Sequence, residues 1–296
     1  MNDTYLYVDE DLRATVGEEA RALVEMTNDA KFLEQGKGIV KVPRTRWLQA
    51  QRYEKHTWMD DGAHATDDRN EEHAEFFDQY RAIAGRTFDR AIELGCGPFT
   101  NLRVLARHVA IRTCALLDPL IASYPAHRHC TYKHGQVKIA PSRLDTALGA
   151  TLPGRALRRL TRMLRPAWLE KGIPIEAALA HPIEEMPPCG TFGLVVMINV
   201  LEHCYDAERI FDNILRVCPP GSVFVFHDRL YQAGEVESET LHRFDAGHPL
   251  RIGEAVITAF LARHFDVLHE RHVDVADHAH GMDLTERGVY FIGVRR

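Results

Sequence analysis

The chain has 296 residues, 45% of them hydrophobic and 26% charged, which is ordinary for a globular protein with room for one large domain and additions. Its formal net charge of −6 excludes the overall positive field that is typical of nucleic-acid-binding proteins. Six widely spaced cysteines without a C-x-x-C pair, no apolar run long enough to span a bilayer and no secretory signal indicate a cytoplasmic protein that binds neither membrane nor metal.

The first part of the chain, residues 1–85, is predicted to form a helical N-terminal extension. A helix is expected over 44–53, because it would begin just after a proline, a residue that suits the first turn of a helix. Further along, Asp68 and Glu71 have the spacing of a capping box, in which two side chains satisfy free backbone N–H groups. This pair predicts a second helix that ends at about Ala84.

From Phe88 onward, apolar runs and amphipathic segments alternate, as strands and helices do in parallel α/β folds. Strands are expected at 90–93, 113–117, 192–198 and 222–226, helices at 99–108, 207–217 and 253–264, and two closing strands at 266–273 and 289–294. A polar loop rather than a helix joins the closing strands, so the last strand should run antiparallel. The order predicts a mostly parallel sheet with an antiparallel last strand.

Residues 121–180 interrupt this alternation and are predicted to be a helical insertion after the second strand. Within it, 155–168 has apolar residues on one helical face and arginines elsewhere. These arginines could contact an anionic substrate, or they could form a solvated basic face. The sequence leaves both interpretations open.

A glycine-rich turn follows the first predicted strand, in the segment Glu93-Leu94-Gly95-Cys96-Gly97. Glycine lacks a Cβ, so the backbone there can turn sharply and a ligand can approach it closely. Asp118 ends the second strand, where an acid can accept both hydroxyls of a ribose. A dinucleotide site would have a third glycine where Thr100 stands, and the antiparallel last strand also argues against one.

Five segments in this order resemble the class I S-adenosylmethionine-dependent methyltransferases over about residues 86–296. The segments are Glu93–Gly97, Asp118-Pro119, Ile183–Pro187, Phe192–Val195 and Asn199–His203. The resemblance implies a Rossmann-like α/β fold with a seven-stranded sheet. It also implies a methyltransferase domain over 86–296, with the insertion at 121–180, preceded by the extension 1–85.

The resemblance implies S-adenosylmethionine as the cofactor and assigns roles by position. Asp118 would hold the ribose hydroxyls, and Glu93 would order the turn and the amino group of the cofactor. The acid that binds adenine in many relatives is absent from its usual place, so Glu184 or the backbone of Ile183 would replace it. The implied cofactor-binding residues are Glu93, Gly95, Cys96, Gly97, Asp118, Pro119, Ile183, Glu184, Asn199 and Leu201.

Methyl transfer requires alignment and, for some O–H or N–H nucleophiles, a base. His227 and Asp228 follow a predicted strand and are catalytic candidates, as is His203, because histidine titrates near neutrality. A structural hydrogen bond within its own loop is an equal alternative for His203. Candidate substrate contacts are Tyr53 and Trp58 in a lid formed by the N-terminal extension, and His242 and His248 in the loop over 229–251.

We therefore predict a methyltransferase that acts on an O or N nucleophile of a small molecule, in specialised metabolism. Two alternatives stay open: a regulatory partner that binds the cofactor without methyl transfer, and another reaction, such as cyclisation, on the same fold. The absence of a basic groove argues against DNA or RNA substrates. The sequence leaves open whether the chain forms a homodimer.

Overall fold

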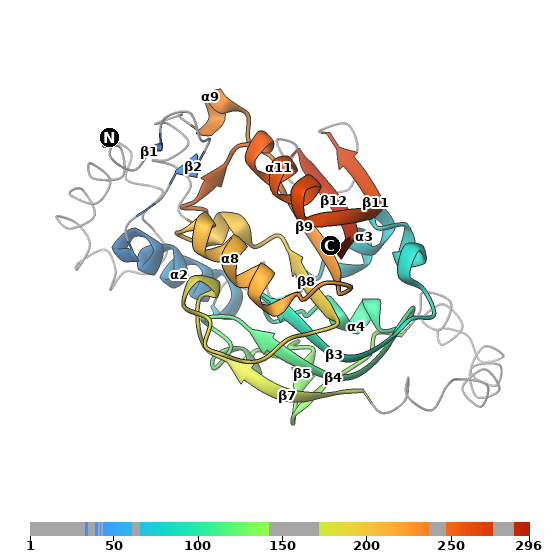
Figure 1. Cartoon of the computed structure of the whole chain (residues 1–296). Helices are drawn as coiled ribbons and strands as arrows, with labels where there is room; N and C mark the ends of the chain where they lie inside the picture. Colours follow the sequence, from blue (N-terminus) through green and yellow to red (C-terminus); the bar gives the residue numbers. More distant parts are fainter. Residues whose placement is uncertain are drawn as a thin grey trace.

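The computed structural model describes residues 33–34, 39–40, 42, 44–60, 66–141, 172–236, 247–274 and 287–296 (Figure 1). The helix predicted over 155–168, the candidate His242 and most of the extension before 44 lie outside these residues. Among the helices that the structure describes, none is both long and apolar enough to cross a membrane.

A nine-stranded sheet forms the centre of the fold, and its strand order differs from the chain order. From one edge to the other, the strands are β11 (Phe265–Val273), β12 (Gly288–Arg295), β9 (Val223–Arg229), β8 (Leu194–Ile198), β3 (Thr87–Leu94), β4 (Ala110–Leu117), β7 (Ile173–Leu179), β6 (Gln136–Val137) and β5 (Tyr132–Lys133). The five strands from β9 to β7 pair in parallel, whereas β12 pairs antiparallel with both β9 and β11. The predicted Rossmann-like α/β sheet with an antiparallel last strand is confirmed, and β5 and β6 extend its seven expected strands.

Helices cover both faces of this sheet (Figure 1). Residues of α3 (Asn70–Phe76) and α4 (Leu102–Leu105) belong to one hydrophobic cluster, and residues of α8 (Ala207–Val217) and α11 (Glu254–His264) belong to the other. Alternate residues of β8 contribute to opposite clusters, Val196 to the first and Val195 to the second. This alternation is the two-residue period of a strand that is buried on both faces.

Several shorter elements surround the sheet. Strands β1 (Leu33–Glu34), β2 (Ile39–Val40) and β10 (Arg251–Ile252) form a small second sheet. The remaining helical elements are α2 (Arg44–Met59), α9 (Ala233–Val236) and the 3-10 turns η3 (Asp78–Ile83), η4 (Tyr124–Ala126), η5 (Ile183–Glu185) and η6 (Leu201–His203). The helix predicted over 44–53 is therefore present in α2 and continues beyond its expected end.

Several predicted elements differ from the observed ones. The helix predicted over 99–108 is shortened to α4 (Leu102–Leu105). The helix expected from Asp68 to Ala84 is divided into α3 and η3, because Asp78, Gln79 and Tyr80 adopt positive φ angles of 49°, 53° and 56° that interrupt a right-handed helix. The last residues of the predicted insertion, Ile173–Leu179, form β7 and pair with β4, so this stretch belongs to the sheet.

The start of α8 agrees with the sequence prediction. Asp206 occupies the N-cap, and its carboxylate accepts a hydrogen bond from the backbone N–H of Arg209 at 3.3 Å. The helix then buries Ile210 and Ile214 against the sheet. A side-chain acceptor at this position satisfies one of the backbone N–H groups that the first turn leaves free.

We predict that Asp206→Ala lowers the free energy of unfolding by about 0.5–2 kcal/mol, the range for loss of an N-cap acceptor. Chemical denaturation of the purified variant measures this change. Asp212→Ala is the matched control, because Asp212 is an exposed residue within the same helix and should leave stability nearly unchanged. Equal unfolding midpoints for Asp206→Ala and the unchanged protein would contradict the assigned cap.

Candidate functional site

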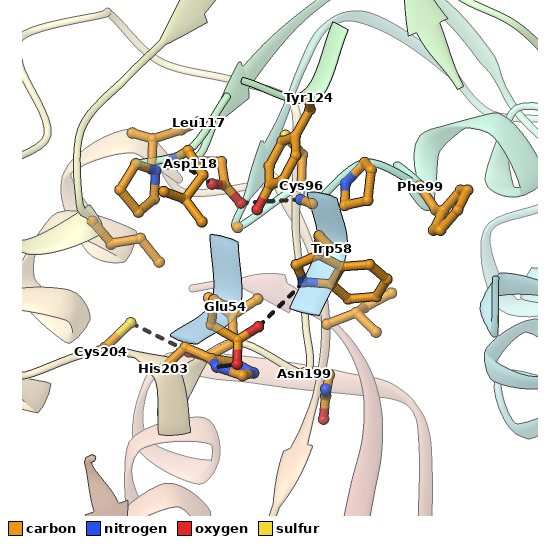
Figure 2. Close-up of a pocket in the computed structure, with 18 of the residues that line it drawn as sticks. Glu54, Trp58, Cys96, Phe99, Leu117, Asp118, Tyr124, Asn199, His203 and Cys204 are labelled. Carbon is orange, nitrogen blue, oxygen red and sulfur yellow. Dashed lines mark hydrogen bonds and ion pairs between the residues drawn. The ribbon is translucent and has the colours of Figure 1, made fainter. Parts of the chain in front are cut away.

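A pocket lies where β3, β4 and β8 end, at their carboxyl ends. Ligands of open parallel sheets bind at this edge, because loops there diverge to both faces. Figure 2 shows Asp118, Tyr124 and Cys96 on one side of the pocket and Glu54 and His203 on the other. The space inside the lining, including the open mouth of the pocket, is about 960 Å³.

The turn after β3 lines this pocket with backbone. Gly95 and Gly97 have φ angles of +71° and +51°, in the left-handed region that favours glycine. A Cβ on Gly95 would lie 2.5 Å from Val200, so the turn packs tightly against the loop after β8. A Cβ on Gly97 would have no neighbour within 4 Å. The backbone of Gly97 therefore faces open space that a ligand can occupy.

Glu93 holds this turn from beneath and does not line the pocket. Its buried carboxylate accepts hydrogen bonds from the Thr100 hydroxyl, from the backbone and side chain of Asn101 at 2.8 and 3.0 Å, and from the Leu102 N–H at 3.4 Å. Burial nevertheless raises the pKa of Glu93 to about 7. The predicted role of ordering the turn fits this arrangement, whereas direct contact with a cofactor amino group does not.

Asp118 lies at the carboxyl end of β4 and lines the pocket. One of its oxygens accepts the Gly97 N–H at 3.1 Å, and the other accepts the Leu120 N–H at 2.8 Å. Burial raises the pKa of Asp118 to about 6. The Tyr124 hydroxyl also hydrogen-bonds this carboxylate, so about one of its roughly four acceptor positions remains for a donor of a bound molecule. Pro119 lines the pocket next to it.

Glu184 offers an acceptor at another position of the pocket lining. Its Oε1 accepts the backbone N–H groups of Tyr205 and Asp206 at 2.6 and 3.1 Å. Its Oε2 is buried and has no hydrogen-bond partner among the described residues. Burial raises the pKa of this carboxyl group. A buried, unpartnered acceptor suits an amino group of a ligand, and the preceding Ile183 lines the pocket as well.

The loop after β8 supplies the third part of the lining. Asn199 has a φ of +58°, and asparagine tolerates this left-handed conformation better than most residues. Asn199 lines the pocket, whereas Leu201 is buried beside it and does not. Val200 and Cys204 line the pocket in the place that the sequence prediction gave to Leu201.

The structure places the catalytic candidates His227 and Asp228 inside β9, away from the pocket lining. The His227 ring stacks on Tyr290, with centroids 3.9 Å apart. Asp228 accepts the backbone N–H groups of Val200 and Leu201 at 2.9 and 2.7 Å. Burial and the nearby Glu202 raise the pKa of Asp228. These contacts favour a structural role for both residues.

One face of α2 covers the pocket. The sequence analysis did not predict most of the residues on this face. Residues with helical spacing, Trp47, Gln51, Glu54 and Trp58, line the pocket. Only Trp58 was predicted, and Tyr53 does not line the pocket. Residues at i, i+4, i+7 and i+11 share one helical face, so this spacing was the signal that could have identified the others.

Three titratable side chains meet at one side of the pocket. The carboxylate of Glu54 lies 3.6 Å from Nδ1 of His203, which is the one catalytic candidate that lines the pocket. The His203 ring packs edge to face on His248, with centroids 4.6 Å apart. The Trp58 N–H donates to the second oxygen of Glu54 at 3.2 Å. Of the two predicted histidines in the loop, His248 thus reaches the site without lining it.

The charge of the lining suits a cationic ligand. Glu54, Asp118 and Glu184 contribute carboxylates, whereas the guanidinium of Arg69 is already paired with Asp67 at 2.9 Å. A sulfonium or ammonium group in this pocket would be favoured by these carboxylates. The open backbone at Gly97, the acceptor Asp118 and the unpartnered oxygen of Glu184 together fit S-adenosylmethionine.

Comparison with known proteins gives a family match over most of the chain. A family model described as a methyltransferase domain matches residues 67–272, more than half of the sequence. No curated protein shows significant similarity to the chain.

Solved structures align with the chain at low identity. The N-methyltransferase NodS from Bradyrhizobium japonicum, solved with S-adenosylhomocysteine, is 17% identical, with a TM-score of 0.47 over 84% of this chain and 98% of that chain. The 1,6-didemethyltoxoflavin-N1-methyltransferase from Burkholderia thailandensis is 13% identical, with a TM-score of 0.46 over 89% and 97%. At these values the likeness says nothing about the methyl acceptor. With the family match and the fold, the chain belongs to the class I S-adenosylmethionine-dependent methyltransferases.

Proposed function

We propose that the protein transfers a methyl group from S-adenosylmethionine to an oxygen or nitrogen of a small molecule, in specialised metabolism. One observation carries the proposal: a single pocket joins the turn at Gly97 and the acceptor Asp118 to polar side chains of α2 and η6. A cofactor held by the first group would direct its reactive end toward the second. This arrangement is what an in-line transfer to a bound nucleophile requires.

Different residues of the chain would bind different parts of the cofactor. Asp118 would accept the ribose hydroxyls, Glu184 would accept the adenine amino group through Oε2, and Asn199 would contact the methionine end. The turn at Gly97 would bring backbone close to the cofactor without a clashing side chain. When bound, S-adenosylmethionine supplies an activated methyl group, so the protein needs to supply alignment and exclusion of water.

The cover provided by α2 supports a small acceptor. Trp47 and Gln51 both donate hydrogen bonds to the backbone oxygen of His203, at 3.0 and 3.2 Å, and so tie α2 to the loop after β8. A pocket closed in this way admits a small molecule more readily than a polymer. The proposal does not need a homodimer.

The thiols support a proposal for the location of the protein. All six cysteines are free, and five of them are buried. We propose the cytoplasm, because free thiols persist in a reducing compartment.

The function is tested by supplying S-adenosylmethionine to the purified protein together with small phenols, catechols, amines and imidazoles. We expect S-adenosylhomocysteine to form with at least one of these classes, as measured by mass spectrometry. The Asp118→Asn variant should form much less S-adenosylhomocysteine when S-adenosylmethionine is limiting. Tight cofactor binding without turnover for any acceptor would favour the alternative of a regulatory partner.

Asp118 also predicts a pH dependence of cofactor binding. Ribose hydroxyls donate to the ionised carboxylate, so affinity for S-adenosylhomocysteine should be full above pH 6 and fall about tenfold per pH unit below it, given the pKa of about 6. Asp118→Asn should flatten this profile and weaken binding above pH 6 by roughly 10- to 150-fold, the equivalent of one charged hydrogen bond.

Calorimetry from pH 5 to 8 measures both effects. Asp89→Asn is the matched control, because the Asp89 side chain is 79% exposed and far from the lining. An unchanged affinity and profile in Asp118→Asn would refute the assignment of Asp118 to the ribose.

A further inference from the structure

The cluster of Glu54, His203 and His248 brings together residues from three distant parts of the sequence (Figure 2 labels the first two). One ligand atom from each of these side chains lies within 4.8 Å of the others. Glu54 comes from α2, His203 from η6, and His248 from the segment before β10. Two imidazoles and one carboxylate form a donor set that binds divalent transition metals in many proteins.

The distance between Glu54 and His203 suits a shared ion better than a direct hydrogen bond. Glu54 Oε1 lies 3.6 Å from His203 Nδ1, beyond the 2.7–3.2 Å of a normal N–H···O bond. Ligand atoms that are each about 2.0–2.2 Å from a tetrahedral zinc ion lie roughly 3.3–3.6 Å apart. His203 Nδ1 also lies 3.2 Å from the Gly247 oxygen, so ligation would need the tautomer that carries its proton on Nε2.

Further side chains hold the cluster in place. The Trp58 N–H donates to Glu54 Oε2, which fixes the carboxylate and leaves Oε1 facing His203. The buried carboxylate of Glu202 lies 3.5 Å from Nε2 of His248, beyond a normal hydrogen bond, and acts on that ring through its charge. A carboxylate behind a ligating histidine is a recurrent outer partner in metal sites.

We propose that Glu54, His203 and His248 bind one divalent transition metal ion, with zinc as the probe, beside the cofactor pocket. Three protein ligands leave a coordination position open, and Glu54 and His203 both line the pocket. An oxygen of the methyl acceptor would occupy that position and be held there as a metal ligand. This substrate role rests on the proposed function, whereas the metal site does not. The proposed metal site differs from our expectation, from the sequence, of a protein that binds no metal.

In the test, the full-length protein is first freed of metal by a chelator. Zn²⁺ is then titrated in and its binding is measured by calorimetry. A parallel titration uses Co²⁺ instead of Zn²⁺ and measures its visible absorption. We expect one ion per chain. Loss of a ligand in Glu54→Gln, His203→Ala or His248→Ala should weaken binding at least as much as loss of an outer partner, which costs about 10- to 100-fold. Trp58→Phe keeps an aromatic side chain, removes the N–H donor to Glu54 and should weaken zinc binding within that range.

His56→Ala is the matched control, because His56 lies on the same helix and pairs with Asp60 at 3.4 Å outside the pocket lining. It should bind zinc as the unchanged protein does. Thermal unfolding of each metal-free variant confirms that Glu54→Gln, which keeps the shape of the side chain, is folded.

The proposal would be overturned if the protein did not bind one zinc ion per chain. It would also be overturned if Glu54→Gln and the unchanged protein bound zinc with equal affinity. Equal losses in Glu54→Gln and His56→Ala would overturn it as well. The titration contains neither cofactor nor acceptor, so its outcome is independent of turnover. Zinc binding in a protein that transfers no methyl group would support the metal site and reject the proposed function.

Discussion

The buried carboxylate of Glu93 is the interaction on which the pocket depends. It ends β3 inside the protein and accepts hydrogen bonds from Thr100, Asn101 and Leu102, where the chain enters α4. Backbone N–H groups at a helix start otherwise lack partners, and the carboxylate satisfies them within the core. Because the turn between Glu93 and Thr100 is held at both ends, Gly97 can present open backbone to a ligand.

Asp228, on β9 two strands away from β3, fixes another loop in the same way. Its buried carboxylate accepts the N–H groups of Val200 and Leu201 and so fixes the loop after β8. Burial raises the pKa of both Asp228 and Glu93, which is the cost of keeping an acid inside the protein. Two loops that meet at Gly95 and Val200 are thus each ordered by a buried carboxylate of the sheet.

The pocket becomes a site for chemistry only when α2 covers it. Trp47 and Gln51 fasten α2 to the His203 backbone, and the same helical face then delivers Glu54 to the His203 side chain. Helix α2, one part of the N-terminal extension, therefore belongs to the pocket lining. The lid stays a prediction, and Trp58 is the one predicted lid residue in the lining.

The sequence by itself determined the strands β3, β4, β8, β9, β11 and β12 and the helices α8 and α11, together with the turn at Gly97 and the position of Asp118, because apolar runs, glycines and caps act over a few residues. Tertiary structure decided the rest. His227 is buried because β9 continues past Phe226 to pair with β12, a ladder that no local pattern reveals. Glu54 meets His203 through the packing of α2 on η6, which joins residues far apart in the chain. Side chains at such distances acquire a common function only when burial of their elements brings them together.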